Sequence, residues 1–340
     1  MTDYDLLRSL CTAFGPSGFE EQVANIIMNV LKSEDIEFNK DNIGNIFVEI
    51  GEGKPVTLIT AHMDEIGFIV THITESGFLR MTNLGGVRTS SLPGVLVDVK
   101  SPESVVTGII GSLPPHISKG EAKEPSIDEL YVDIGASSKE EVLGLGIRKG
   151  SPIVFKSLYL EDNVKVISKA LDDRLGCFVL IEALKRLSRN PEGRIIVGFT
   201  VQEEVGCRGA SALAHKFKPD IGISIEGTIA NDTIGTPEEK VITRTRKGVA
   251  MRLMDATIIA NNELVRKIIA LAEENNINYQ LQISPRSGTD AKWYITLGSL
   301  VTGISIPVRY IHSPYSMAFK SDIEDTIKLL SLILNRNLLS

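Results

Sequence analysis

The stretch Arg194–Arg208, which reads RIIVGFTVQEEVGCR, constrains the fold more than any other part of the sequence. Its first half is a short, nearly unbroken apolar run rich in Ile and Val, the pattern of a strand buried on both faces of a parallel sheet. If that strand is central, Glu203 and Glu204 lie just beyond its C-terminal end, where open α/β sheets bind their ligands. Ionising two carboxylates this close together costs free energy, because the like charges repel, unless a cation neutralises one or they share a proton. The pair therefore predicts either a metal ligand beside a general base or a solvated acidic strand end.

The composition is that of a globular protein with room for two domains. The chain has 340 residues, of which 43% are hydrophobic, and this is enough for a substantial core. Its formal charge of −7 and its pI near 5.4 provide no drive toward nucleic acid or an anionic membrane. One short basic cluster, TRTRKG at 243–248, is expected to be a solvated strand edge or hairpin. We therefore expect no nucleic-acid partner.

The sequence also predicts the compartment. No stretch reaches the ~20 apolar residues of a membrane span, and the N-terminus MTDYDLLRSL lacks the apolar region of a signal peptide. The three cysteines, Cys11, Cys177 and Cys207, are odd in number and lack metal-binding spacing, which fits reduced and mostly buried thiols. We expect a cytoplasmic protein without a membrane partner.

Apolar periodicity predicts alternating strands and helices. Strands are expected at 43–50, 56–60, 194–201, 221–225, 279–283 and 299–307, and helices at 4–14, 170–187, 209–216, 262–274 and 321–338. Ser17 stands three residues before Glu20, a capping-box spacing that predicts the start of a further helix. Residues 240–255 suggest a hairpin. The alternation indicates an α/β fold with a mixed, largely parallel sheet flanked by helices.

One long segment departs from this rhythm. Between residues 67 and 162, short β-type runs alternate with Gly, Pro and Ser, and no helical period persists. We therefore expect residues 1–70 and 163–340 to form the α/β domain, with 71–162 inserted as a β-rich domain. GLGIRKG at 144–150 lacks the spacing of a phosphate-binding loop. His116, which follows two prolines, is expected in a loop of the insertion that could approach a substrate.

Side chains suited to metal binding recur where buried strands end. His62 follows one strand and stands two residues before Asp64, so the imidazole could bind a metal while the carboxylate orients a partner. Glu226 ends another strand, and His312 follows the last one. Asp172 begins a helix, where capping is the ordinary role of an aspartate. Together these residue types match a divalent-metal site, and the number of carboxylates suggests two metals that share a bridging ligand.

At this point the sequence resembles a known family. The motifs TAHMDEIGF, KALDDRLGC, TVQEEVGCRGA, SGTDA and RYIHSP, in this order, are similar to those of the M42 family of dinuclear metalloaminopeptidases, the glutamyl and tetrahedral aminopeptidase group. The resemblance covers essentially the whole chain and implies a zinc-exopeptidase-like fold. It also implies that the β-rich insertion is a dimerisation domain, and that the chain self-associates into a dimer or a tetrahedral dodecamer.

The resemblance implies two divalent metal ions per subunit, usually zinc or cobalt. The ligands would be His62, Asp172, Glu204, Glu226 and His312, with Asp172 bridging. One metal would be held by His62, Asp172 and Glu226, and the other by Asp172, Glu204 and His312. Many members carry aspartate where this chain has Glu226, whose extra methylene shifts the expected position of the carboxylate.

The resemblance further implies that Glu203 is the general base and that Asp64 orients His62. The expected function is a metal-dependent aminopeptidase that hydrolyses N-terminal residues from peptides through a hydroxide held by two metals. Two alternatives stay open. A glycosidase of the endoglucanase type can use paired carboxylates but does not require the histidines or a bridging aspartate. A catalytically silent assembly protein could keep the fold, although the full set of ligands argues against it.

Overall fold

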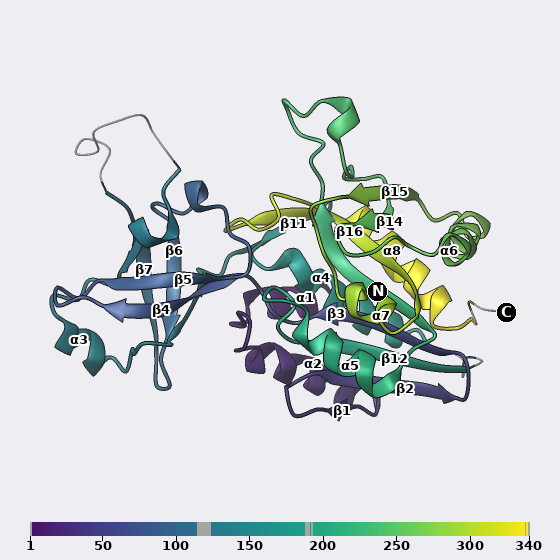
Figure 1. Ribbon diagram of the computed structural model, residues 1–340, viewed down its shortest axis with the longest axis horizontal. Coiled ribbons are helices and arrows are strands. Elements are labelled where there is room, and N and C mark those ends of the chain that lie inside the picture. Colours follow the sequence, from purple (N-terminus) through teal and green to yellow (C-terminus); the bar gives the residue numbers. More distant parts are fainter. Residues whose placement is uncertain (1, 114–123, 188–190, 192, 337, 339–340) are drawn as a thin grey trace.

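The computed structural model describes residues 2–113, 124–187, 191, 193–336 and 338. Figure 1 shows two bodies side by side: a β-barrel on the left, and on the right an α/β domain built from both ends of the chain. The predicted fold class, a mixed sheet flanked by helices with an inserted all-β unit, is confirmed. His116 lies outside the described residues. None of the described helices is long and apolar enough to cross a membrane.

Within the described residues, the α/β domain contains an eleven-stranded sheet of order β1-β2-β12-β3-β13-β16-β17-β11-β10, with β14 and β15 joined beside β16. The strands are β1 (Asn39–Lys40), β2 (Ile46–Glu52), β3 (Val56–His62), β10 (Tyr159–Glu161), β11 (Lys165–Ser168), β12 (Gly193–Thr200), β13 (Ile221–Ile229), β14 (Val249–Asp255), β15 (Tyr279–Ser284), β16 (Leu300–Arg309) and β17 (Ser316–Phe319). The central strands β12, β3, β13 and β16 run parallel to one another. Every residue of β3 is buried, as the apolar run of a two-faced parallel strand requires.

Helices cover both faces of this sheet. They are α1 (Tyr4–Thr12), α2 (Glu21–Ser33), α4 (Leu171–Leu184), α5 (Arg208–Phe217), α6 (Asn262–Glu274), α7 (Ala291–Ile295) and α8 (Lys320–Ile333), with a 3-10 turn η3 (Glu238–Lys240). Buried side chains of α1, α2, α4, α6 and α8 pack into one core against the sheet. Those of α5 and α7 pack into a second core on strands β3, β12 and β16. The sheet is therefore the middle layer of three.

The inserted unit is a closed barrel with its own core. Its strands follow the order β4-β5-β8-β7-β6-β9. They are β4 (Gly67–Ile73), β5 (Leu79–Leu84), β6 (Leu96–Lys100), β7 (Val105–Gly111), β8 (Tyr131–Asp133) and β9 (Pro152–Phe155), accompanied by η1 (Thr89–Ser91), η2 (Ile127–Glu129) and helix α3 (Lys139–Gly144). The apolar interior includes Phe68 and Phe155, whose rings meet edge to face at 5.6 Å. Since β3 leads directly into β4, the barrel begins close to His62.

A buried ion cluster fixes the junction between β3, α1 and α4. Nζ of Lys169 donates to both oxygens of Glu65, at 2.6 and 2.7 Å, and the guanidinium of Arg174 lies 3.2 Å from the same carboxylate. All three side chains are at most 1% exposed. Removing one partner of such a buried pair typically costs about 3–5 kcal/mol of stability. Because Lys169 and Arg174 flank Asp172, this cluster holds the start of α4 in place.

Two local predictions are wrong. The Ser17–Glu20 capping box is absent: α2 has no side-chain cap, and Oγ of Ser17 donates to Asp64 instead. Residues 240–255 contain one strand, β14, which pairs in parallel with β15 and antiparallel with β16. In both places a partner distant in the sequence provides the hydrogen bonds that a local motif would have made.

Candidate metal centre

The carboxyl ends of the central strands bring the predicted residues to one edge of the sheet. His62 is the last residue of β3 and lies in register with Thr200 on β12. Glu203 and Glu204 follow soon after β12, Glu226 lies in β13, and His312 follows β16. This edge is the place where open α/β sheets bind their ligands.

Two consecutive aspartates at the start of α4 have different roles. The backbone torsions of Asp172 and Asp173 are not helical, so the regular turns of α4 begin after them. Asp173 accepts a hydrogen bond from the backbone N–H of Gly176 at 2.8 Å. It also accepts from the backbone N–H groups of His62 and Gly227, each at 3.1 Å. Asp173 is therefore the capping residue, and Asp172 faces the site.

Asp172 lies between the two histidines. Its Oδ1 is 3.3 Å from Nε2 of His62, and its Oδ2 is 3.3 Å from Nε2 of His312. Nε2 of His312 also lies 3.6 Å from Oε1 of Glu204. A carboxylate that presents a different oxygen to each of two imidazoles has the arrangement that a ligand shared by two metals needs.

Two groups of three side chains that include a histidine offer potential ligand atoms that all lie within 4.8 Å of one another. They are His62, Glu203 and Glu204 in one group, and Asp172, Glu204 and His312 in the other. The second group contains the residues predicted to hold one of the two metals. Glu226 belongs to neither group; its Oε1 accepts from the backbone N–H of Asp290 at 3.3 Å. The set predicted for the other metal is thus brought together only in part.

Asp64 lies beside His62, but its main contacts are elsewhere. Nδ1 of His62 is 3.1 Å from the backbone oxygen of Asp64 and 3.4 Å from its Oδ1. The Asp64 carboxylate accepts from the backbone N–H groups of Glu203 and Glu204 at 2.9 and 3.1 Å, and from Oγ of Ser17 at 2.6 Å. Asp64 therefore fixes the backbone of the two glutamates as well as the ring of His62.

The barrel contributes to the site through the loop after β5. Nδ1 of His312 lies 2.7 Å from the backbone oxygen of Gly86. A ring N–H donated to that carbonyl leaves Nε2 with a lone pair directed at Asp172 and Glu204. Gly85 has φ +85°, and a Cβ at this position would stand 2.9 Å from Oε2 of Glu204. Only a glycine fits so close to that carboxylate in this backbone conformation.

The local electrostatics are dominated by negative charge removed from water. Burial raises the pKa of Glu203 to about 7 and that of Glu204 to about 8. Burial opposes the shift at Asp172, but the imidazoles of His312 and His62, each 3.3 Å from one of its oxygens, hold its pKa below the usual range. Burial would lower the pKa of His312, yet the carboxylates of Glu204 and Asp172 raise it to about 10. Protons on the imidazoles and divalent cations are alternative ways to balance these charges.

The residues fit a divalent metal centre. Oδ1 of Asp172 is buried and has no hydrogen-bond partner among the described residues. Burying an unpaired carboxylate oxygen costs free energy unless a proton or a cation compensates its charge. The donor set combines imidazole nitrogen with carboxylate oxygen, which suits zinc, cobalt or manganese better than a soft cation such as copper(I). Asp172, Glu204 and His312 are the residues that would hold one such ion.

Three residues around the centre were not predicted from the sequence. Ser17 supports Asp64, Gly86 supports His312, and Glu20 accepts from the backbone N–H groups of Gly18 and Gln202 at 2.7 and 3.0 Å. Ser17 and Glu20 have the spacing of a capping box, so the sequence predicted a local hydrogen bond between them. It did not predict their actual partners, Asp64 and Gln202. Gly86 acts through its backbone and leaves no residue-type signal.

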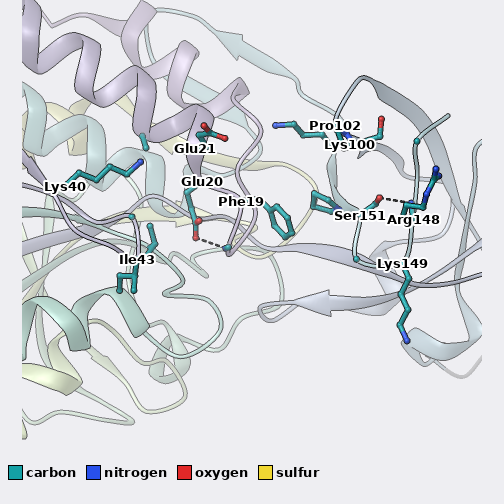
Figure 2. Close-up of a pocket in the computed structure, with 18 residues that line it drawn as sticks. Phe19, Glu20, Glu21, Lys40, Ile43, Lys100, Pro102, Arg148, Lys149 and Ser151 are labelled. Atoms are coloured by element: carbon teal, nitrogen blue, oxygen red, sulfur yellow. Dashed lines mark hydrogen bonds between the residues drawn. The ribbon is translucent and has the colours of Figure 1, made fainter. Parts of the chain in front are cut away.

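A cavity of about 590 Å³ is lined by residues of both domains. Figure 2 shows the wall formed by Phe19 and Glu20 facing Arg148 and Ser151 of the barrel. None of the predicted metal ligands lines this cavity. Glu20 connects the cavity to the site, because its carboxylate holds the backbone of Gln202 beside the two glutamates.

Comparison with known proteins shows which family this chain is similar to. The profile of the M42 glutamyl aminopeptidase family matches residues 44–329. A lysyl aminopeptidase from Pyrococcus furiosus is 32% identical over 343 residues, covering 98% of this chain and 97% of that protein.

Solved structures share the same architecture over nearly the whole chain. A TET aminopeptidase from the marine sediment archaeon Thaumarchaeota archaeon SCGC AB-539-E09 has a TM-score of 0.93 at 34% identity, with 98% of this chain and 95% of that chain covered. The Pyrococcus horikoshii TET1 peptidase, which can assemble into a tetrahedron or a large octahedral shell, has a TM-score of 0.88 at 35% identity, with 97% and 98% covered. The chain belongs to the M42 glutamyl aminopeptidase family.

Proposed function

We propose that this protein is a metal-dependent aminopeptidase that removes N-terminal residues from peptides with two divalent metal ions. The observation that carries the proposal is the position of Asp172, which presents one oxygen to His62 and the other to His312 at 3.3 Å each. Family membership gives the reaction class, and the relatives named above are aminopeptidases. We propose zinc or cobalt as the ions, because the donors are imidazoles and carboxylates.

His62, Asp172, Glu204, Glu226 and His312 are the proposed ligands. When bound, the ions would polarise the scissile carbonyl and lower the pKa of a water molecule. Glu203 is the proposed general base: its Oε2 lies 3.9 Å from Nε2 of His62, beside the ligands but outside the group that contains Asp172. Burial raises the pKa of Glu203 to about 7, close to the value at which a carboxylate both takes up and returns a proton near neutral pH.

The same carboxylates give a reason for exopeptidase specificity. The free α-amino group of a peptide is a cation near neutral pH, and a site rich in buried carboxylates attracts and orients it. A glycosidase would use two carboxyl groups directly on the sugar. Its chemistry does not require a carboxylate that contacts two imidazoles, as Asp172 does. We therefore propose peptides, rather than polysaccharides, as the substrates.

We further propose that the barrel domain mediates dimerisation and that dimers assemble further. Val105 and Ile109 lie on the same, exposed face of β7, and Ile109 pairs across the strands with Leu96 of β6. These three side chains are exposed by 53%, 41% and 48%. An exposed apolar strip of this kind on a barrel surface is typical of a protein interface. The three cysteines are free and buried, which supports the cytoplasm as the proposed compartment.

Chelation tests the proposed function. We expect activity on aminoacyl-anilides to be lost after treatment with a chelator and to return on addition of zinc, cobalt or manganese, because the ligands supply charge and geometry but no redox chemistry. Metal analysis of the active protein should find two ions per subunit. Full turnover of an aminoacyl-anilide by metal-free protein, or cleavage of cellulose in its place, would contradict the proposal.

A further inference from the structure

The two oxygens of Glu203 face different neighbours. Oε2 is directed at the metal centre, where it lies 3.9 Å from Nε2 of His62. Oε1 lies 3.0 Å from Sγ of Cys207, which donates its proton to this oxygen. Cys207 is only 3% exposed. The glutamate therefore separates the proposed metal centre from a buried thiol on its other side.

The backbone between these two residues explains why they meet. The N–H groups of Gly206 and Cys207 both donate to the backbone oxygen of Glu203, at 2.8 Å. Cys207 has φ +54°, a left-handed conformation that is unfavourable for a residue with a side chain and is found where the surrounding structure enforces it. This tight turn, from which α5 begins, folds the thiol back onto the Glu203 carboxylate.

Asp290 completes a group of three. One of its carboxylate oxygens and the ligand atoms of Glu203 and Cys207 all lie within 4.8 Å of one another. Asp290 is 2% exposed. Its Oδ2 accepts from the hydroxyls of Thr60 and Thr200 at 3.0 and 2.7 Å, whereas its buried Oδ1 has no hydrogen-bond partner among the described residues. An unsatisfied buried carboxylate oxygen beside a thiol and a second carboxylate indicates a place for a cation.

We propose that Cys207, Glu203 and Asp290 form a further binding site for a thiol-binding divalent cation such as zinc or cadmium, and that occupation of this site inhibits the enzyme. Thiolate sulfur favours zinc and cadmium over harder cations, and one sulfur with two carboxylate oxygens supplies three of the four ligands of a tetrahedral zinc site. On binding, the S–H bond of Cys207 breaks, its proton leaves to solvent, and a sulfur–metal bond forms in its place.

The inhibition follows from the shared glutamate and rests on the proposed function. A cation on Oε1 would hold the Glu203 carboxylate as its own ligand, so the side chain whose Oε2 faces the metal centre is no longer available as the base. Sγ of Cys207 donates its proton to Oε1 of Glu203, so the cation must displace this hydrogen-bonded proton in order to bind. The site therefore fills when zinc or cadmium is in excess, and manganese, a harder cation, fills it poorly.

Cadmium titration tests the site itself. The protein carrying its own metals is titrated with cadmium chloride, and the ultraviolet charge-transfer band of a cadmium thiolate is recorded for the wild type and for Cys207→Ser. We expect the band in the wild type and its loss in Cys207→Ser. Cys11→Ser is the matched control, because Cys11 is also buried but lies in α1, and it should keep the band. Asp290→Asn keeps the thiol and should weaken cadmium binding.

Activity measurements test the consequence. Zinc and cadmium in excess should inhibit the wild type at concentrations where manganese does not, and Cys207→Ser should lose this sensitivity relative to its own uninhibited rate. Absence of the band in the wild type, or its persistence in Cys207→Ser, would overturn the site. A band without inhibition would overturn the inhibitory role. A protein that gives the band but shows no aminopeptidase activity would instead refute the proposed function and leave the cation site standing.

Discussion

At the scale of single residues, Glu203 and Glu204 are adjacent in sequence but differ in their surroundings. Glu204 lies in both groups of potential ligands that contain a histidine, and stands 3.6 Å from Nε2 of His312. Glu203 is in the group with His62 and in the group with Cys207, and it is absent from the group that contains Asp172. Burial raises both pKa values, to about 7 for Glu203 and about 8 for Glu204. This asymmetry supports a ligand at Glu204 and a base at Glu203.

Substitution of each glutamate separates the two roles. Glu203→Gln should retain metal and fold, because the amide is nearly isosteric, while turnover falls by the ~10²–10⁴-fold typical of losing a general acid–base group. KM should change much less, since the proton transfer belongs to the transition state. Glu204→Gln should lower metal occupancy, because a neutral amide is a poorer ligand than a carboxylate. Measuring the metal content and kcat of both variants distinguishes the ligand from the base. If Glu203→Gln lost its metal while Glu204→Gln retained it, Glu203 would be the ligand and Glu204 the base.

At the scale of elements, the buried strands were predictable and their polar supports were not. The apolar run at 56–60 falls within β3, and the run at 194–201 matches β12 except for its last residue, because burial on both faces leaves a continuous signal in the sequence. The ends of these strands then predicted where His62 and the glutamates would meet. The hydrogen bond from Ser17 to Asp64 spans 47 residues, and the one from Gln202 to Glu20 spans 182. Such contacts depend on tertiary packing, which no local pattern records.

The loop after β5 offers a test of how the barrel supports the metal centre. Gly85→Ala would place a Cβ 2.9 Å from Oε2 of Glu204, so we expect reduced metal content and lower kcat. Gly94→Ala is the matched control, because Gly94 has the same φ of +85° but nothing within 4 Å of an added Cβ. Both variants carry the backbone strain of roughly 1–2 kcal/mol expected for alanine in a left-handed conformation. Equal metal content in the two variants would show that the contact with Glu204 is unimportant.

At the scale of the whole molecule, the barrel supports the metal centre and has a proposed role in assembly, and a deletion would not separate the two. Its loop provides the carbonyl of Gly86 to His312, and its outer surface carries the apolar strip of Leu96, Val105 and Ile109. Removing residues 73–161 would abolish the strip and the Gly86 contact together, so loss of activity in such a variant would say nothing about assembly. A single substitution on the strip leaves the metal centre intact. The strip is therefore the better place to test whether activity depends on assembly.

Ile109→Asp should dissociate the oligomer while the subunit keeps its metals. In an isolated subunit, where Ile109 is 41% exposed, a carboxylate at this position stays in water and pays no desolvation free energy. In an apolar interface the same carboxylate would be buried without a partner, which is unfavourable. Sedimentation velocity should therefore show a smaller species for Ile109→Asp than for the wild type. Ile234→Asp is the control, because it makes the same chemical change at a fully exposed isoleucine in the α/β domain and should leave the sedimentation coefficient unchanged. If Ile109→Asp sedimented like the wild type, the outer face of β6 and β7 would not be the dimerisation surface. If it dissociated and still turned over substrate at the wild-type rate, assembly would serve a purpose other than completing the metal centre.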